Sequence, residues 1–219
     1  MTYFGNPEKL MKLLEQLWKG LGNTLYLFIA TLLLSLPLGL LVALLRRSRL
    51  SLIRLPISFY ILIMRGTPLI LQIFAIYFSI PLLLNRSFDR MTATVIAFVL
   101  NYAAYFAEIF RGGIDSIHTG QWEAAKALGM NRSQVFLHVI LPQVMRRVVL
   151  PVSNEVITLV KDTALVTAVG IVDLYRAAKN ATSSSGSLEP LFMAGLVYLL
   201  LNALVTWVFS VLHRRSALP

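Results

Sequence analysis

The sequence predicts an all-α integral membrane protein that forms a bundle of about five transmembrane helices. Of its 219 residues, 57% are hydrophobic and only 14% are charged, whereas a soluble domain carries about 25% charged residues. Several runs without any charge are long enough to cross a bilayer, which takes about 20 residues per helix. The length fits a single domain over residues 1–219.

The apolar runs place the helices in order along the chain. Charged residues and leucines recur in a helical pattern between residues 8 and 19, which predicts an amphipathic helix at the membrane surface rather than a cleavable signal peptide. Residues 180–187 are rich in serine, which predicts an exposed loop before the last span. The spans are expected at about residues 20–45, 55–80, 91–110, 148–172 and 191–212.

The basic residues predict the orientation, because lysine and arginine collect in cytoplasmic loops. Five spans put the termini on opposite sides of the membrane. Residues 46–54, 111–147 and the C-terminus hold eleven lysines and arginines, and the loops on the other side hold seven. We therefore expect an external N-terminus and a cytoplasmic C-terminus. This topology accounts for the net charge of +10 without a nucleic-acid partner.

The composition argues against several kinds of site. The chain has no cysteine, which excludes disulfides, thiol catalysis and cysteine metal ligands. Its three histidines are far apart and have no metal-ligand spacing, so we expect no metal site. The phosphate-binding sequence Gly-x-x-x-x-Gly-Lys-Ser/Thr does not occur, so the chain itself is not expected to bind ATP.

The most polar interval, about residues 120–142, is predicted to form two short helices. Gly129 suits the left-handed position that ends a helix, and Asn131 with Gln134 has the pattern of a capping box for the next helix. Pro142 is expected to end that second helix. From these residues alone, the interval is either an amphipathic connector on the membrane surface or a segment presented to a partner.

The amino-acid sequence of this interval resembles the cytoplasmic EAA motif of ATP-binding-cassette (ABC) importer permeases. In that motif Glu-Ala-Ala is followed by three residues and glycine, then by nine residues, a branched apolar residue, one residue and Leu-Pro. The chain departs from it only in having Val139 where isoleucine is more usual. Residues matching the motif or the polar amino acid branch of the family are Glu123, Ala124, Ala125, Gly129, Arg65, Gly66, Thr67, Pro68, Asn154, Glu155, Lys161 and Asp162.

This resemblance implies a type I ABC importer fold and a permease that translocates polar or charged amino acids by alternating access. It implies a prokaryotic inner-membrane location and a coupling helix that docks on an ATPase through Glu123, Ala124, Ala125 and Gly129. The implied partners are two ATPase subunits, a second permease copy or homologue and an extracytoplasmic amino-acid-binding protein. The subunit itself would have no catalytic residue and no cofactor, since the ATPase would bind ATP and magnesium.

Three ionisable residues lie in the fourth expected span, where a central charge costs about 2.5–3.5 kcal/mol on insertion scales. Glu155 shares a helix face with Thr158, and both are candidates for substrate binding. Glu155 could meet the ammonium or cationic side chain of an amino acid, or it could form a structural ion pair with Arg65 or with Lys161 of a second copy. For Lys161 and Asp162 we expect a structural role, in which they pair across helices.

The third span carries polar groups at helical spacing. Asn101, Tyr105 and Glu108 lie along one face. An amide and an aromatic ring at mid-depth suit the binding of an amino acid, so Asn101 and Tyr105 are candidates for the pocket, although a buried amide also joins helices. Glu108 lies near the cytoplasmic end, and we expect it to pair with Arg111.

The second span is interrupted at residues 65–68. Pro68 lacks a backbone donor and should kink the helix, and Gly66 permits close approach of a neighbouring helix. The four residues are either a hinge or gate for alternating access or a static kink with a snorkelling arginine. They are Arg65, Gly66, Thr67 and Pro68.

Two other functions stay open at this point. A secondary transporter or channel acting alone would be indicated by inverted repeats, but none is evident and five spans do not divide into equal halves. A non-transporting membrane scaffold would leave the costly polar residues inside the membrane without a use.

Overall fold

The computed structural model describes residues 3, 5–85 and 88–216, and within them the protein is helical without any strand. Arg86, one of the basic residues used to predict the orientation, lies outside the described residues. The segments η1 and η2 are π-helical and η3 is a 3-10 helix. The elements are α1 (Pro7–Arg46), α2 (Ser51–Gly66), α3 (Leu69–Phe74), η1 (Ala75–Ser79), α4 (Ile80–Leu84), α5 (Arg90–Asp115), α6 (Thr119–Ala127), α7 (Arg132–Gln134), η2 (Val135–Ile140), α8 (Leu141–Asp162), η3 (Thr163–Val169), α9 (Leu174–Ser185) and α10 (Glu189–Ser216).

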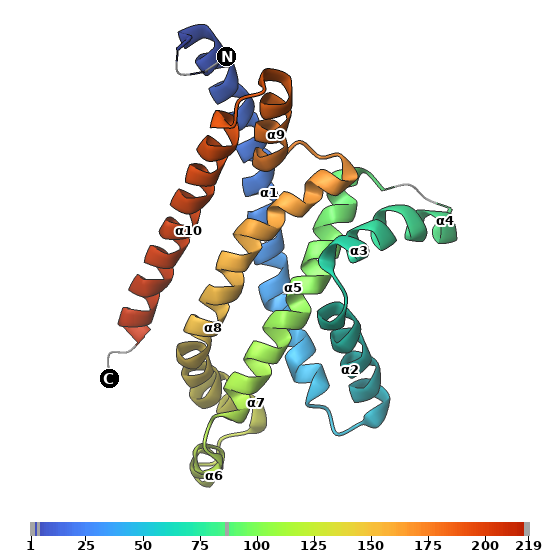
Figure 1. The fold of residues 1–219 in the computed structure, drawn as a ribbon. Coiled ribbons are helices and arrows are strands. Elements are labelled where there is room, and N and C mark those ends of the chain that lie inside the picture. Colours follow the sequence, from blue (N-terminus) through green and yellow to red (C-terminus); the bar gives the residue numbers. More distant parts are fainter. Residues whose placement is uncertain (1–2, 4, 86–87, 217–219) are drawn as a thin grey trace.

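The long helices form an elongated bundle with two distinct ends (Figure 1). We call the end that carries α6 and α7 the α6 end, and the opposite end, next to the N-terminus and α9, the α9 end. The C-terminal part of α10 runs towards the α6 end. Among the described residues, four helices are long and apolar enough to cross a membrane, or five if the bent pair of α2 with α3 counts as one span. The predicted all-α membrane bundle is therefore confirmed.

The core is centred on the contact between α1 and α5. A Cβ atom added at Gly39 of α1 would lie only 2.7 Å from the Cβ atom of Phe106, so the two backbones approach as closely as glycine allows. Small side chains on α5 make the same approach possible along its length. The buried alanines of α5 are Ala93, Ala97, Ala103, Ala104 and Ala107.

The amphipathic N-terminal segment is not a separate surface helix, because α1 runs without a break from Pro7 to Arg46. Its amphipathic pattern is real, but part of the apolar side packs against protein, while Met11, Leu14 and Trp18 stay exposed. Leu13 and Leu17 are buried in a cluster with Leu174 and the alanines of α9. Since α9 and α10 cover this side, the segment extends the first span beyond the expected start.

The expectation of an exposed loop over residues 180–187 is wrong, because α9 continues to Ser185. Asp173 caps this helix, and its carboxylate accepts hydrogen bonds from the N–H groups of Tyr175 (3.1 Å) and Arg176 (3.0 Å). Burial raises the pKa of Asp173, and these hydrogen bonds oppose that rise. The cap and the buried alanine face together favour a helix that the serine-rich composition did not indicate.

The turn chemistry of the polar interval is as predicted, except at Pro142. Gly129 has a φ of +78°, and Asn131 and Gln134 form a complete capping box with bonds of 3.0 and 2.9 Å. Pro142, however, lies inside a continuous helical stretch, because the π-helical η2 leads directly into α8 just before this proline. The second helix therefore does not end at Pro142 but continues through η2 into α8.

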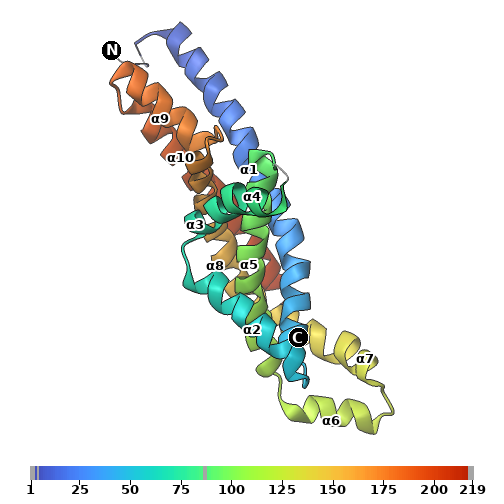
Figure 2. The ribbon, with the colours of Figure 1, turned by 90° about the vertical axis from the view of Figure 1, so that its right-hand side faces the viewer.

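The second predicted span is broken between α2 and α3, whose axes meet at 113°. Pro68 lies between the two helices and cannot donate to the carbonyl of Met64, four residues earlier. The predicted kink is therefore present, and it is sharp enough to turn α3, η1 and α4 sideways, so that α4 stands out from the long helices in Figure 1 (see also Figure 2).

Candidate functional site

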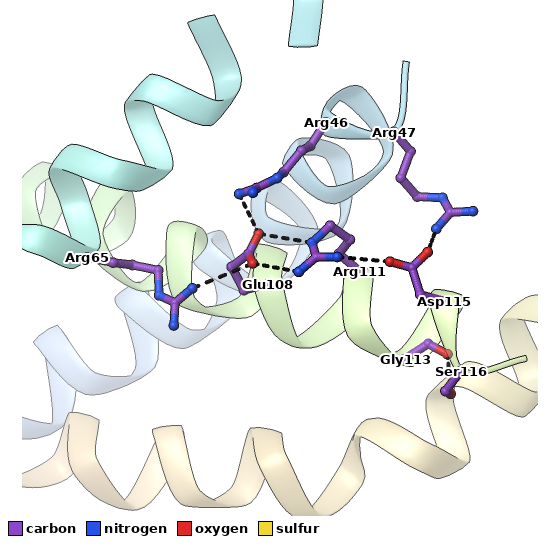
Figure 3. Close-up of polar contacts among 8 residues, drawn as sticks. All are labelled: Arg46, Arg47, Arg65, Glu108, Arg111, Gly113, Asp115 and Ser116. Carbon is purple, nitrogen blue, oxygen red and sulfur yellow. Dashed lines mark hydrogen bonds and ion pairs between the residues drawn. The ribbon is translucent and has the colours of Figure 1, made fainter. Parts of the chain in front are cut away.

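A cluster of charged residues joins α1, α2 and α5 (Figure 3). Glu108 lies at its centre with a side chain that is only 15% exposed. Its carboxylate contacts Arg46 at 2.6 Å, Arg111 at 2.9 Å and Arg65 at 3.6 Å. The ion pair expected between Glu108 and Arg111 is thus present, but two more arginines share the same carboxylate.

Asp115 extends this cluster by two turns towards the end of α5 (Figure 3). It forms ion pairs with Arg47, the residue that follows α1, and with Arg111, the latter at 2.9 Å. We call Glu108, Asp115 and their four arginines the Glu108 cluster. Because four guanidinium groups face two carboxylates, the cluster carries excess positive charge while it fixes the ends of α1 and α2 to α5.

A cleft of about 440 Å³ opens beside the Glu108 cluster, between α1, α2 and α5. Its polar lining comes from Arg46, Arg65, Glu108 and Ser58. Its volume is in the range of small-molecule sites. The predicted substrate residues do not line it, however, so the cleft and the predicted pocket are different places.

Two of the predicted residues, on α2 and α5, are in contact, and a third on α8 interacts with them through its charge. The guanidinium carbon of Arg65 lies 5.3 Å from the centroid of the Tyr105 ring, which is a cation–π contact. Arg65 also interacts electrostatically with Glu155, which is partly buried on α8. Arg65 therefore contacts Glu108 and the ring of Tyr105, and it is close enough to α8 to interact with the charge of Glu155.

Asn101 has a different environment from Tyr105 and Glu108. Its side chain is buried, and its amide nitrogen donates to the carbonyl of Met64 and to the side-chain oxygen of Gln72, both at 2.9 Å. Both of its donors are therefore engaged inside the protein. Substrate binding by Asn101 stays a prediction.

The remaining candidates on α8 are spread around that helix. Thr158 is exposed, and its hydroxyl donates to the carbonyl of Asn154 at 3.1 Å. Lys161 is exposed and makes no ion pair within 4 Å in the part of the chain that the structure describes. Asp162 instead accepts a hydrogen bond of 2.7 Å from the hydroxyl of Tyr102, which joins α8 to α5.

The segment that carries the EAA motif projects from the α6 end beyond the bundle (Figure 2). Glu123, Ala124 and Gly129 are exposed, and Leu128 is 83% exposed. Ala125 is the exception, because it is buried against the helices behind α6. An exposed acidic and apolar surface is thus presented on a segment with a packed inner side.

A polar contact joins this segment to α8, because Gln143 donates to Gln121 of α6 at 3.3 Å. Beside it, the guanidinium of Arg147 donates to the backbone carbonyl of Ser116 and to its hydroxyl, the latter at 2.9 Å, which joins α8 to the end of α5. A displacement of α6 would therefore pull on the first turns of α8, the helix that carries Glu155 farther along.

Several site residues were not predicted from the sequence, among them Arg46, Asp115, Gln72 and Tyr102. The partners of Arg46 and Tyr102 are remote in sequence, so helical spacing gives no signal of them. Asp115 follows Arg111 by four residues, a spacing that indicates their ion pair. Gln72 also has a local signal: Pro68 leaves the Met64 carbonyl without its usual donor, and a nearby amide is one way to replace it.

Comparison with known proteins identifies the family to which this architecture belongs. Residues 35–217 match the family described as binding-protein-dependent transport system inner membrane component. The chain belongs to this family. It is therefore the membrane permease of an ABC importer, and the stand-alone transporter and the inert scaffold are excluded. The multi-pass helices and the inner-membrane location of the family agree with the predicted class.

Relatives of this permease match over nearly their whole length. The arginine transport system permease protein ArtQ of Bacillus subtilis (strain 168) is 37% identical over 90% of both chains. The octopine transport system permease protein OccM of Rhizobium radiobacter is 38% identical over 95% of this chain and 89% of its own. A crystal structure of an amino acid ABC transporter with histidines superposes with a TM-score of 0.86 at 31% identity, covering 98% of this chain and 99% of the other.

Proposed function

We propose that this permease translocates polar or charged amino acids by alternating access, driven by two ATPase subunits that dock on α6. The observation that supports this most directly is the exposed EAA segment with its contact between Gln121 and Gln143, because it connects a docking surface to the helix that carries Glu155. The names of the relatives add the substrate class: one is an arginine permease and another an octopine permease. A second permease copy or homologue would complete the pathway, and an extracytoplasmic binding protein would deliver the substrate.

In this proposal the α6 end faces the cytoplasm. The excess of basic residues at that end agrees with the positive-inside rule. The absence of native cysteine allows a direct test, because single cysteines need no background removal. In intact cells, Ser183→Cys on α9 is expected to react with a membrane-impermeant maleimide, and Ser133→Cys on α7 only after the membrane is opened. The reverse labelling pattern would invert the proposed topology.

Glu155 is the proposed contact for a positively charged group of the substrate. It is partly buried on α8 and interacts electrostatically with Arg65 and Asp162. The two carboxylates, Glu155 and Asp162, would both attract an ammonium or guanidinium group of the substrate. Glu155→Gln keeps the shape of the side chain and removes its charge. We expect this variant to lower transport of cationic amino acids more than that of neutral ones.

The measurement is uptake of a panel of amino acids by proteoliposomes that contain the permease, its ATPase and its binding protein. Glu15→Gln is the matched control, because its carboxylate makes an exposed ion pair with Lys19 far from the site. If uptake and apparent affinity do not change for Glu155→Gln, then Glu155 is a structural residue. Transport by the permease without nucleotide or ATPase would overturn the whole proposal.

A further inference from the structure

The break between α2 and α3 leaves a specific backbone group without its helical partner. In an α-helix the carbonyl of Met64 would accept from the N–H of residue 68, but residue 68 is proline. In the hydrocarbon region no water is available to donate a hydrogen bond to an unpaired carbonyl, so leaving it unpaired is costly. Something else must therefore donate to Met64, and the sharp bend must be held by contacts outside the two helices.

Gln72 supplies the first of these contacts from α3. Its amide nitrogen donates to the Met64 carbonyl at 3.0 Å, and to the carbonyl and the hydroxyl of Thr67 at 3.1 and 2.9 Å. One side chain on the far side of the break thus caps the end of α2. Since carbonyl groups only accept hydrogen bonds, the amide nitrogen must face them.

Asn101 supplies the second contact from α5. Its amide nitrogen donates to the Met64 carbonyl and to the side-chain oxygen of Gln72, which leaves that oxygen satisfied. Asn101 and Gln72 are 5% and 7% exposed, so both amides are enclosed by protein. We call Gln72 and Asn101 the amide clasp. It connects the end of α2, the start of α3 and the middle of α5.

The amide clasp lies next to the groups that the proposed function uses. Arg65 follows Met64 directly, and its guanidinium lies over Tyr105 and beside Glu108. Asn101, Tyr105 and Glu108 recur along one face of α5 at helical spacing. The direction of the last turn of α2 therefore determines the position of the Arg65 guanidinium. Ile61 is the one residue of α2 that is buried, although Ile57, Tyr60 and Met64 pack partly against the core and the hydroxyl of Tyr60 donates to the carbonyl of Leu100.

We infer that Gln72 and Asn101 are positioning residues for translocation, which hold the α2–α3 break at its observed angle and thereby place Arg65 over Tyr105 and beside Glu108. This inference rests on the proposed transport function. It assigns Asn101 a role that differs from binding of the substrate. A ligand of the substrate would act on the choice of amino acid, whereas a positioning residue acts on every transported amino acid alike.

The first test measures the bend itself. Spin labels are attached at Leu52→Cys on α2 and Leu82→Cys on α4, which are 86% and 84% exposed and stand on either side of the break. The complex with ATPase and binding protein is placed in lipid nanodiscs, and the distance between the labels is measured. A straight helix would separate the two positions by roughly 45 Å, at 1.5 Å per residue, and the bent pair by clearly less.

The variants follow from the hydrogen bonds. Gln72→Met with Asn101→Leu removes every donor of the clasp at similar volume, and it is expected to broaden the distance distribution. Adding Pro68→Ala to this pair restores the N–H that Met64 lacks and is expected to shift the distribution towards the straight value. Pro68→Ala alone should keep the short distance, because the clasp still holds the bend. An unchanged distribution in all three variants would refute the inference.

The second test separates positioning from substrate binding. Asn101→Leu is expected to lower uptake of all accepted amino acids by one common factor, about tenfold, which corresponds to 1.4 kcal/mol. The Gln72→Met variant should give nearly the same loss, and the double variant should not multiply the two effects, because both residues serve one network. Asn202→Leu, an amide of α10 outside this network, is the control and should transport normally.

The outcomes distinguish this inference from the proposed function. If the unaltered complex does not take up any amino acid, the proposed function fails, whatever the label distances show. If it transports normally but Asn101→Leu changes the ranking of substrates and leaves the label distance unchanged, then Asn101 is a substrate ligand. A variant that fails to insert is replaced by Asn101→Ala, which loses the donors without adding a carboxyl group inside the membrane.

Discussion

Replacement of Glu108 by glutamine is expected to destabilise the permease and to remove most of its transport. The change leaves Arg46, Arg65 and Arg111 close together without the carboxylate that they share. Loss of one partner of a buried ion pair costs about 3–5 kcal/mol. We expect a value near the lower limit, because the side chains of Arg65 and Arg111 are 43% and 35% exposed.

The measurement is thermal unfolding of the purified complex, together with uptake. Asp115→Asn is the matched control from the same cluster, because its side chain is 44% exposed and such pairs contribute about 0–1 kcal/mol. Arg46→Gln in the Glu108→Gln background removes the nearest unpaired charge and should restore part of the stability. If Glu108→Gln melts like the Asp115→Asn control, the cluster does not hold α2 to the bundle.

The elements that the sequence alone could predict are those that depend on local pattern. Uncharged runs of sufficient length indicate spans whatever their neighbours are. The φ of Gly129, the capping box at Asn131 and the kink at Pro68 each depend on residues within one or two turns, and all three are present. The pair of Glu108 and Arg111 is likewise three residues apart on one helix.

The elements that could not be predicted depend on contacts between remote segments. The serine-rich α9 is helical because its buried alanines pack on Leu13 and Leu17, more than 150 residues earlier in the chain. The same packing turns the expected surface helix into part of α1. Periodicity shows that a face exists, but it does not show whether lipid, water or another helix covers that face.

The same distinction between local pattern and remote contacts applies to the candidate site. Helical spacing placed Asn101, Tyr105 and Glu108 on one face, which is correct. It did not indicate that Asn101 faces a proline break on α2 while Glu108 faces three arginines. The partner of a buried amide or carboxylate is set by helix packing, and a single sequence holds no direct signal of it.

Reversal of the charge at Glu123 is expected to uncouple transport from ATP hydrolysis without affecting insertion or folding. Glu123 is exposed on α6 and makes no ion pair within 4 Å in the described part of the chain, so Glu123→Lys breaks no internal contact. At a docking surface a misplaced charge costs several kcal/mol through repulsion, and each 1.4 kcal/mol weakens docking about tenfold. Glu123→Gln should therefore lie between the parent and Glu123→Lys.

Gly129 tests the same segment through backbone geometry instead of charge. Its φ of +78° is in the left-handed region, where a residue with a side chain loses about 1–2 kcal/mol, although asparagine is tolerated better. An added Cβ atom would meet no neighbour within 4 Å, so a substitution changes only the conformational strain of the backbone. Gly129→Val should reorient Glu123 and Ala124 against the partner and lower uptake strongly, whereas Gly129→Asn should stay close to the parent.

Both series are read in reconstituted complexes by uptake and by ATPase activity, each with and without the binding protein. An uncoupled variant keeps basal hydrolysis but loses its stimulation, or fails to retain the ATPase during purification. Since the contacts of Arg147 with Ser116 and of Gln143 with Gln121 are untouched, a loss of uptake would arise at the exposed surface of α6. Normal uptake in both Glu123→Lys and Gly129→Val would show that α6 does not carry the force of the ATPase, and the connection to α8 would then have no role in coupling.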